Sequence, residues 1–584
     1  MKSLTERYWK LPSPFVASQR EMFLSKKLQL EPEILRILGN RGLKEETEII
    51  QFLYPTLNDL ESASTLKGID ESCSLLYDAL KNKQKIIIWG DYDVDGVTAT
   101  SLLIRFFTSL NCKPDWFVPN RLEDGYGLNK NILSKYAKKY SKNTPPVLIT
   151  VDCGISNSTE IEYIKSKGWK VIVTDHHETG ELHLAADAII NVKQEGCEFS
   201  NKDLSGVGTA FYLCIALRSF LNKKKYFNNI ITVPNLKNLL DLVAIGTIAD
   251  MVPQSNGNRV LIKGGFEIIN SNPSVGVGAL MSESNIHSNN ITSEDIAFQI
   301  APRINAAGRM GDASLAVKLL TETRRKNAAT IAKKLTRLNT ERKKECTENL
   351  EYTLTIIGNK QSNGQKILIQ KIDCPLGVIG IVASQLVNKL RIPVILITEI
   401  EDKIHGKVLK GSCRSVPWVN IYQLLYNTRE FHLEYGGHKM AAGVTLLESN
   451  VEQFRNAASL IVEKEFVRER EYEKIDVEIP IEKALSDKLI KEFQLLEPFG
   501  IKNEKPTFVE RKIIPCELRQ IGKLGDHISF IRKGKFTNNK CIAFGFGEYE
   551  NYLKNVEKVD AIYTTSVSRF KKAVHWQAQM IDFL

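Results

Sequence analysis

Short apolar runs alternate with longer amphipathic stretches in the first half of this 584-residue chain. Five runs end at turn or polar residues: 86–89, 116–118, 147–151, 171–174 and 242–245. Runs of this length, rich in β-branched residues, are typical of strands buried on both faces of a parallel sheet. The stretches between them show helical spacing of apolar positions: 97–110, 128–140 and 158–167. The pattern therefore predicts an α/β domain in which strands and helices alternate.

Metal-capable side chains follow four of these runs: Asp91, Asp93, Asp95, Asp152, Asp175, His176, His177 and Asp250. The run 116–118 leads instead to a cation, Arg121. Because ligands bind at the carboxyl ends of parallel strands, we expect the acidic residues to converge at one edge of the sheet. Asp93 and Asp95 alternate along an extended segment and so face the same way. Any one of these acids alone is equally well explained as a helix N-cap or an Asx turn.

A convergent group of carboxylates is unstable unless a cation neutralises it, because like charges repel strongly away from water. Carboxylates with one or two imidazoles suit Mn²⁺ or Mg²⁺ better than Zn²⁺. Two such ions can activate a water and hold the attacking and leaving oxygens of a displacement at phosphorus. The residues therefore predict a two-metal site for cutting phosphoesters.

These residues lie in segments that resemble, in order, the motifs of the DHH phosphoesterase superfamily: 90–96 (Gly-Asp-Tyr-Asp-Val-Asp-Gly), 151–154, 175–177 and 246–253. Within it the chain is most similar to the RecJ family of single-strand-specific exonucleases. Further matching segments are 303–310, 377–381, 411–415 and 436–443 (Gly-Gly-His-Lys-Met-Ala-Ala-Gly). The resemblance extends from about residue 40 onward. It implies 5′→3′ hydrolysis of single-stranded DNA, release of 5′-mononucleotides, and a role in DNA recombination and repair.

The resemblance also implies a role for each site residue. The metal ligands are Asp93, Asp95, Asp152, His176 and Asp250, with Asp152 as the bridge between two Mn²⁺ or Mg²⁺ ions. His177 contacts the scissile phosphate or the leaving oxygen, Asp175 orients a neighbouring histidine, and Asp91 is a further ligand or supports one. Arg121, Arg303, Arg309, Ser412 and Arg414 line the 5′-phosphate pocket or lie near it, and His438 contacts the strand backbone. The implied partners are single-stranded DNA, single-strand-binding protein and a RecQ-type helicase.

The chain divides into five predicted parts. A helical lead-in (1–80) precedes the parallel-sheet DHH catalytic domain (81–325), and a long connecting helix (326–358) has too narrow an apolar stripe for a core of its own. A second α/β domain of the DHHA1 kind (359–460) contains Ser412 and Arg414 on one side of a strand. Short alternating runs in 465–584 predict an OB-like β-barrel that binds nucleic acid, an assignment that rests partly on the resemblance.

Composition agrees with a globular enzyme of this kind. Hydrophobic residues make up 43% and charged residues 25% of the chain, as in ordinary globular proteins. The net charge of +11 favours a polyanionic partner, although a solvated cationic surface explains it too. The ten cysteines show no disulfide or metal-ligand spacing. No apolar run approaches the length of a membrane span, and we expect a cytoplasmic protein with no membrane partner.

Two other functions compete with the exonuclease. A relative that cleaves short oligonucleotides or cyclic dinucleotides, or a pyrophosphatase, would share the metal site, but is expected to lack the C-terminal barrel. A non-catalytic scaffold that binds single strands would share the fold, but is expected to have lost metal ligands. Every predicted ligand is present in this sequence.

Overall fold

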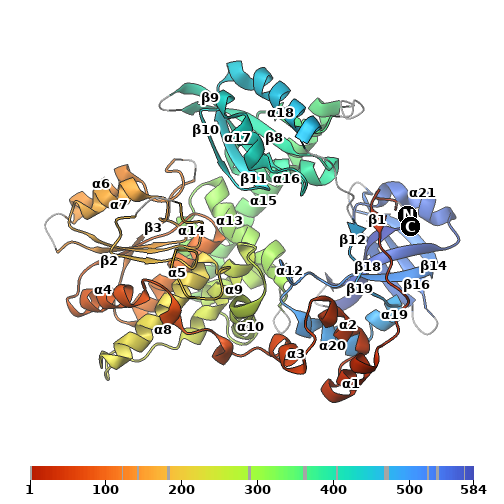
Figure 1. Cartoon of the computed structure of the whole chain (residues 1–584), viewed down its shortest axis with the longest axis horizontal. Helices are drawn as coiled ribbons and strands as arrows, with labels where there is room; N and C mark the ends of the chain where they lie inside the picture. Colours follow the sequence, from red (N-terminus) through yellow and green to blue (C-terminus); the bar gives the residue numbers. More distant parts are fainter. Residues whose placement is uncertain are drawn as a thin grey trace.

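The computed structural model describes residues 3–121, 123–140, 144–180, 184–286, 291–358, 365–402, 405–465, 472–522, 525–534, 538–570 and 573–584. Three lobes surround the centre of the molecule (Figure 1). The catalytic domain contains a parallel sheet, the second α/β domain lies at the top of the view, and the C-terminal sheet lies at the right. No helix in these described ranges is both long and apolar enough to cross a membrane. The predicted start of the second domain, residue 359, lies outside them.

The catalytic domain is built on five parallel strands in the order β3-β2-β4-β5-β6. They are β2 (Ile86–Trp89), β3 (Asp115–Phe117), β4 (Val147–Val151), β5 (Lys170–Thr174) and β6 (Ala188–Ile190). Alternate side chains of β2 face opposite layers: Ile86 and Ile88 pack in one apolar core, Ile87 and Trp89 in another. Because both faces are covered, every residue of β2 is buried and apolar, as predicted.

Helices cover the two faces unequally. On one side lie α6 (Lys130–Lys139) and α7 (Ser158–Lys165). On the other lies a larger helical layer: α4 (Ile69–Lys81), α5 (Val94–Ser109), α8 (Gly206–Lys223), α9 (Leu240–Ala249), α10 (Asn256–Ser271), α11 (Val275–Glu283), α13 (Ala301–Met310) and α14 (Ser314–Leu320). A π-helical turn (Ile296–Ile300) leads into α13. The parallel-sheet prediction is confirmed.

The prediction of a strand at 242–245 is wrong, because these residues lie in α9. Residues Leu240 to Ile248 of this helix are all buried, with neighbours on every side. A short apolar run at the centre of a layer has the same composition whether it forms a strand or a fully buried helix. Asp250 therefore reaches the edge of the sheet as the C-cap of a helix.

A single helix, α15 (Arg325–Ile357), leads to the second α/β domain. Its five strands have the order β10-β11-β9-β8-β7, and β7 and β8 are its parallel pair. The strands are β7 (Leu368–Lys371), β8 (Val394–Asp402), β9 (Gly406–Arg414), β10 (Glu434–Gly437) and β11 (Ala441–Leu446). One face packs on α16 (Leu376–Leu390), and the other on α17 (Ile421–Asn427) and α18 (Val451–Glu465).

The C-terminal sheet has the strand order β13-β14-β18-β19-β17-β16-β15. Its strands are β13 (Val477–Glu478), β14 (Phe508–Ile513), β15 (Pro515–Ile521), β16 (His527–Lys533), β17 (Asn538–Ala543), β18 (Val559–Phe570) and β19 (Ala573–Phe583), with helices α19 (Ile481–Ala484), α20 (Asp487–Leu496) and α21 (Glu550–Asn555). Within the described residues the outer strands β13 and β15 are not paired with each other, so the sheet is not closed by hydrogen bonds there.

Residues 3–53 pack on this C-terminal sheet. Helices α1 (Gln19–Leu28), α2 (Pro32–Asn40) and α3 (Glu46–Leu53) share an apolar core with the sheet and α20. Strand β1 (Tyr8–Trp9) pairs with β12 (Tyr472–Glu473), and Trp9 Nε1 donates to Asp582 Oδ2 at 2.9 Å. Figure 1 shows α1 and α2 beside α20, with the two chain ends close together. We call residues 3–53 and 472–584 the end module.

Candidate metal centre

The residues that follow β2, β4, β5 and α9 meet in one cluster of carboxylates and imidazoles. Three overlapping sets have donor atoms within 4.8 Å of one another: Asp152, His176 and His177; Asp95, His176 and Asp250; Asp91, Asp93 and Asp152. Asp152 and His176 each belong to two of these sets. The structure thus brings the predicted metal ligands from four separate segments to one place.

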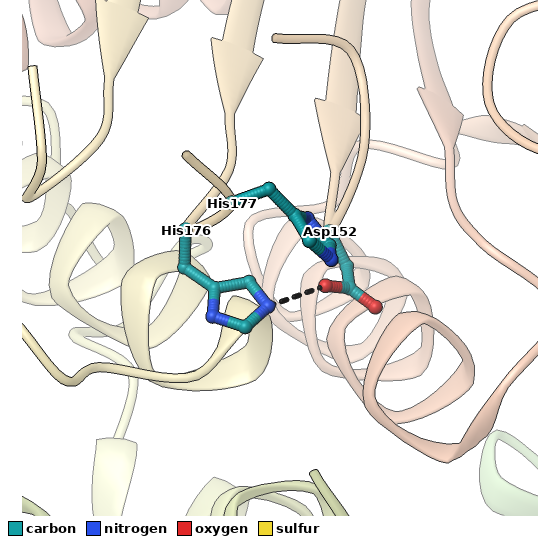
Figure 2. Close-up of side chains that lie close together, drawn as sticks. All are labelled: Asp152, His176 and His177. Atoms are coloured by element: carbon teal, nitrogen blue, oxygen red, sulfur yellow. Dashed lines mark ion pairs between the residues drawn. The ribbon is translucent and has the colours of Figure 1, made fainter. Parts of the chain in front are cut away.

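His176 lies among three carboxylates. Its Nε2 atom is 3.1 Å from Asp152 Oδ1, 3.6 Å from Asp250 Oδ2 and 3.9 Å from Asp95 Oδ2. Figure 2 shows the His176 ring directed at the Asp152 carboxylate, with the side chain of the next residue, His177, also near Asp152. Donors that share one Mn²⁺ or Mg²⁺ ion lie about 3 Å apart, since each is roughly 2.1 Å from the ion. The 3.1 Å separation fits two donors to one ion, and the other two separations are longer than that by 0.5 and 0.8 Å.

Several donor atoms in the cluster are buried without a hydrogen bond in the described part of the chain: Asp91 Oδ1, Asp152 Oδ1, His176 Nε2 and Asp250 Oδ2. A buried polar atom without a partner is costly, so native proteins rarely leave several together. A divalent cation satisfies such atoms at once. The donor set, made of oxygens with one or two imidazole nitrogens, fits Mn²⁺ or Mg²⁺.

Electrostatics point the same way. Burial, with repulsion from Asp93, raises the pKa of Asp95 to about 7. Burial, with repulsion from Asp95 and Asp93, raises the pKa of Asp250 to about 9. Burial also holds the pKa of Asp152 well above its usual range. The cluster cannot carry its full negative charge alone, so it requires protons or metal ions.

Two of the predicted ligand carboxylates are fixed by helix N-termini. Asp93 caps α5, accepting a hydrogen bond from Gly96 N at 3.0 Å. Asp93 is therefore both a helix N-cap, one of the two explanations that the sequence allowed, and a member of the acidic cluster. Asp95 accepts from the first turn of α8, Gly206 N at 2.6 Å and Val207 N at 2.9 Å. Each oxygen keeps a second lone pair for a metal.

Asp152 has a left-handed backbone, with φ of 59°. This conformation is uncommon for a residue other than glycine and is concentrated at functional sites. The turn brings its side chain against α8, where a Cβ atom on Gly206 would lie only 2.6 Å from Asp152 Cβ. Only glycine allows the helix to approach the metal cluster so closely at this position.

His177 is held by Asp175 and Tyr126. The Asp175 carboxylate, fully buried, lies 2.7 Å from His177 Nδ1 and also accepts from Ile155 N at 3.0 Å. Burial alone would lower the pKa of His177, but the Asp175 carboxylate outweighs it and raises that pKa. The hydroxyl of Tyr126 donates to Asp152 O and lies 3.3 Å from both that atom and His177 Nδ1. These contacts fix His177 beside the cluster.

Four arginine side chains gather next to the metal cluster. Burial, with repulsion from Arg121, Arg342 and Arg414, lowers the pKa of Arg309 to about 10. Arg121 lies over the ring of Tyr92, 5.4 Å from its centroid, and Tyr92 stands between Asp91 and Asp93 in sequence. Among the described residues none of the four pairs with a carboxylate. Like charges held together in this way favour an anionic ligand such as phosphate.

The second domain contributes a hydroxyl and one of these cations. On β9, Arg414 donates from Nη1 to Ser412 Oγ at 2.9 Å. A Cβ atom on Gly380 of α16 would lie 2.8 Å from Arg414 and 3.0 Å from Ser412 Oγ. Because Gly380 has no side chain, the surface of α16 leaves room for this pair. Arg309 of the catalytic domain also contacts this helix, since its Nη1 donates to Gly377 O at 3.2 Å.

One predicted pocket residue, Arg303, and the predicted strand-backbone contact, His438, lie outside the arginine group. Arg303 donates to Gln299 O at 2.6 Å and to Thr336 Oγ1 of α15 at 3.2 Å, so it links helices. His438 is exposed in the turn between β10 and β11, where its backbone N–H donates to Ala441 O at 2.8 Å. The structure does not bring either residue into the arginine group.

The sequence interpretation missed two residues. Tyr126 lies between Gly125 and Gly127, both with positive φ. Two glycines around one aromatic residue indicate a tight turn, so the sequence did contain a signal for this position. Arg342 is one of many cations on α15, and nothing in the local pattern distinguishes it from its solvated neighbours.

Three family models match this chain: the DHH family N-terminal domain at residues 85–247, the DHHA1 domain at 364–464 and the RecJ OB domain at 475–582. Several curated relatives carry the name single-stranded-DNA-specific exonuclease RecJ. The Escherichia coli protein is 35% identical over 439 residues, covering 73% of this chain and 74% of that protein. The Bacillus subtilis protein is 30% identical over 564 residues, covering 96% and 69%.

A solved structure agrees with this comparison. The crystal structure of RecJ in complex with Mn²⁺ from Thermus thermophilus superposes with a TM-score of 0.81 and 27% identity. The match covers 100% of this chain and 80% of that one. A crystal structure of RecJ from the same organism in complex with Mg²⁺ superposes with a TM-score of 0.74. The OB assignment of the C-terminal sheet is supported by the family model even though the sheet is not closed within the described residues.

Proposed function

This chain belongs to the RecJ family of DHH phosphoesterases, and from that premise we propose that it is a metal-dependent 5′→3′ exonuclease on single-stranded DNA that releases 5′-mononucleotides. The observation that carries the proposal is the pairing of two sites: a cluster of metal-binding carboxylates and, beside it, four arginines without carboxylate partners in the described part of the chain. A terminal phosphate bound by the arginines leaves the next phosphodiester beside the carboxylates.

The metal ligands we propose are Asp93, Asp95, Asp152, His176 and Asp250. Asp152 belongs to two donor sets and its carboxylate has two oxygens, so it would serve both ions. Two Mn²⁺ or Mg²⁺ ions held there would lower the pKa of a water and neutralise the charge that develops at phosphorus. The ligands themselves act by position: Asp93 and Asp95 are fixed by helix N-termini and need not reorganise.

His177 is the group we assign to the scissile phosphate or the leaving oxygen. With Nδ1 bonded to Asp175, its Nε2 is free to donate to a phosphate oxygen, and its raised pKa favours the protonated form that stabilises an anion. Asp175 holds the ring in this orientation, and Asp91 completes the buried acidic group beside Tyr92.

The 5′ end is the end that we expect the pocket to select. Arg121, Arg309, Ser412 and Arg414 present guanidinium groups and a hydroxyl suited to a terminal phosphate dianion, which carries more charge than an internal phosphodiester. We add Arg342 to this group. His438, exposed in its turn, is free to contact the strand backbone outside the pocket.

The test is a denaturing-gel time course with Mn²⁺ on strands labelled at the 5′ or the 3′ end. We expect immediate release of labelled mononucleotide from the 5′ label and gradual shortening from the 3′ label, with no cutting by Asp152→Asn. Arg414→Ala should lose most of the preference for 5′-phosphate over 5′-hydroxyl ends, because it removes a charge-assisted contact worth roughly 1.5–3 kcal/mol, tenfold or more in rate.

Two other outcomes would replace the proposal. If long strands survive while dinucleotides or cyclic dinucleotides are hydrolysed, the chain is a short-substrate phosphodiesterase. If strands are bound but never cut, it is a scaffold. The family resemblance also supports a role in DNA recombination and repair beside single-strand-binding protein and a RecQ-type helicase, which a pull-down with the purified proteins would test.

A further inference from the structure

Two cations on α10 lie one helical turn apart and face the end module. Arg259, only 2% exposed, donates to three backbone carbonyls: Phe52 O at 2.7 Å, Leu495 O at 2.9 Å and Leu496 O at 3.0 Å. Lys263 donates to Leu53 O at 2.6 Å and to Leu495 O at 3.0 Å. One face of a catalytic-domain helix thus binds carbonyls from two distant segments.

All these carbonyls belong to the last residues of two helices, α3 and α20. The final carbonyls of a helix have no partner within the helix and form the negative end of its dipole. Arg259 also lies over the Phe52 ring, 3.7 Å from its centroid. Among the described residues neither cation forms an ion pair with a carboxylate. The two helix ends together balance the charges of the buried Arg259 and the partly buried Lys263, so withdrawal of either end is costly.

The contacts join three parts of the chain. Helix α3 comes from the N-terminal segment and α20 from the C-terminal segment of the end module, while α10 begins shortly after the ligand Asp250. Between Asp250 and α10, Gln254 N donates to Ile501 O at 2.8 Å, and Gly500 lies against the Gln254 side chain. The end module is therefore held against the loop that carries a metal ligand.

A groove of about 720 Å³ runs along this junction. One wall comes from the catalytic domain, with Arg342 of α15 and Ile381 of α16, and the other from the segment 499–505 of the end module. Met251, Phe298 and Ile501 form an exposed apolar lining, with 67%, 67% and 45% of their surface accessible. Arg309 and Arg342 belong to both this groove and the arginine pocket, so the two are continuous. The position of the end module sets the width of the groove.

We propose that Arg259 and Lys263 form a latch that holds the end module on the catalytic domain and so keeps this groove at the width of one strand. The inference rests on the proposed function for its substrate, because the groove continues from the pocket assigned to the 5′ end. Closed, the latch keeps the strand in place between successive cuts. Open, it releases the strand sideways.

The test compares Lys263→Met and Arg259→Met with Lys263→Arg, which keeps the charge and the donors, and with Lys237→Met, which removes an exposed lysine from the same domain. Methionine keeps the apolar stem of a buried cation, so both Met variants should fold. The first readout is hydrogen exchange of residues 46–56 and 487–505 in the full-length protein. The second is the number of nucleotides removed per binding event, measured with a heparin trap. The third is hydrolysis of a tetranucleotide, too short to need the groove.

We expect exchange in both segments to rise by about fivefold or more in the two Met variants and to return in Lys263→Arg. Nucleotides removed per event should fall by about fivefold or more, with tetranucleotide hydrolysis within about twofold. Unchanged exchange would overturn the latch. Faster exchange with unchanged processivity would overturn its role in the groove. If Arg259→Met fails to fold, the Lys263 pair decides. If the wild type cuts no strand at all, the proposed function fails, while the exchange result still decides whether the latch exists.

Discussion

Replacing Gly206 by alanine is the sharpest test of the metal centre, because the added methyl group pushes on a ligand without removing one. A Cβ atom at this position would lie 2.6 Å from Asp152 Cβ and 2.7 Å from Asp152 Oδ1. Ordinary contact begins near 3.4 Å, so Asp152 has to retreat by roughly 0.7 Å. The same residue donates its N–H to Asp95 Oδ2 at 2.6 Å, so a shift of the backbone would move the second ligand instead.

A misplacement approaching 1 Å at a reacting centre costs up to about 10²-fold in rate, or about 2.7 kcal/mol of activation free energy. Overpacking costs about 1–3 kcal/mol of folding stability. Gly208→Ala is the matched control: it lies on the same helix, but its Cβ meets Ser205 Oγ at 3.2 Å and Leu204 Cδ2 at 3.4 Å. Alanine is also the better helix former by about 1 kcal/mol.

The assay is exonuclease rate on a 5′-labelled strand, with Mn²⁺ affinity by calorimetry and thermal denaturation as a check on folding. Gly206→Ala should lose about 10²-fold in rate and bind Mn²⁺ more weakly, while Gly208→Ala stays within about threefold of wild type. A folded Gly206→Ala protein with wild-type rate and metal affinity would show that Asp152 is not held where the mechanism needs it, and the reasoning would fail.

Mn²⁺ at about 100 times its dissociation constant should stabilise the wild type by about 2.7 kcal/mol, and Asp250→Asn should lose that gain. Without metal, Asp250→Asn should be more stable than wild type at pH 8, and this difference in stability should be smaller at pH 5. The Asp250 pKa is raised to about 9, so ionisation costs stability as pH rises from the unfolded value of 3.8; equal denaturation midpoints at pH 8 would contradict this. Tyr126→Phe removes the hydroxyl near Asp152 O and His177, and should lower kcat by roughly three- to tenfold with Mn²⁺ affinity unchanged, since one such hydrogen bond contributes about 0.5–1.5 kcal/mol. Burial and repulsion from Arg259 lower the Lys263 pKa to about 7, with Glu497 and Glu267 opposing. In the unfolded chain Lys263 has its usual pKa of 10.5, so it keeps its proton at pH values where the folded protein has lost it. The free energy of unfolding of the wild type, relative to that of Lys263→Met, should therefore rise by about 1.4 kcal/mol per pH unit above pH 7 in urea denaturation. A difference that stays constant between pH 7 and 9 would refute this prediction.

The sequence predicted the elements whose pattern is local. Strands β2, β4 and β5 are buried on both faces and read as continuous apolar runs, and the metal-capable residues after them converge because parallel strands end at one edge. The same argument predicted a strand where α9 is a helix, because a helix buried all round has no polar face to reveal its period.

What the sequence could not predict depends on contacts between distant segments. Arg303 and Arg309 lie on one helix and look alike, yet one contacts α15 and the other the pocket, a difference decided by rotation about the helix axis. The local sequence around Arg259 is that of an exposed cation. Its burial results from contacts with the C-terminal ends of α3 and α20, which are distant in the sequence. The packing of α1 to α3 on the C-terminal sheet has no local signature either.

That last arrangement has a consequence for biosynthesis. Residues 3–53 leave the ribosome well before their apolar partners, which lie beyond residue 472, about 420 residues later. At 5–20 residues per second this separation amounts to roughly 20–80 s, ample time for the catalytic domain to fold. During that interval the apolar faces of α2 and α3 have no native partner and are exposed to chaperones or to aggregation. A ribosome stalled before the C-terminal sheet emerges would therefore carry a folded catalytic domain and an unprotected N-terminal segment.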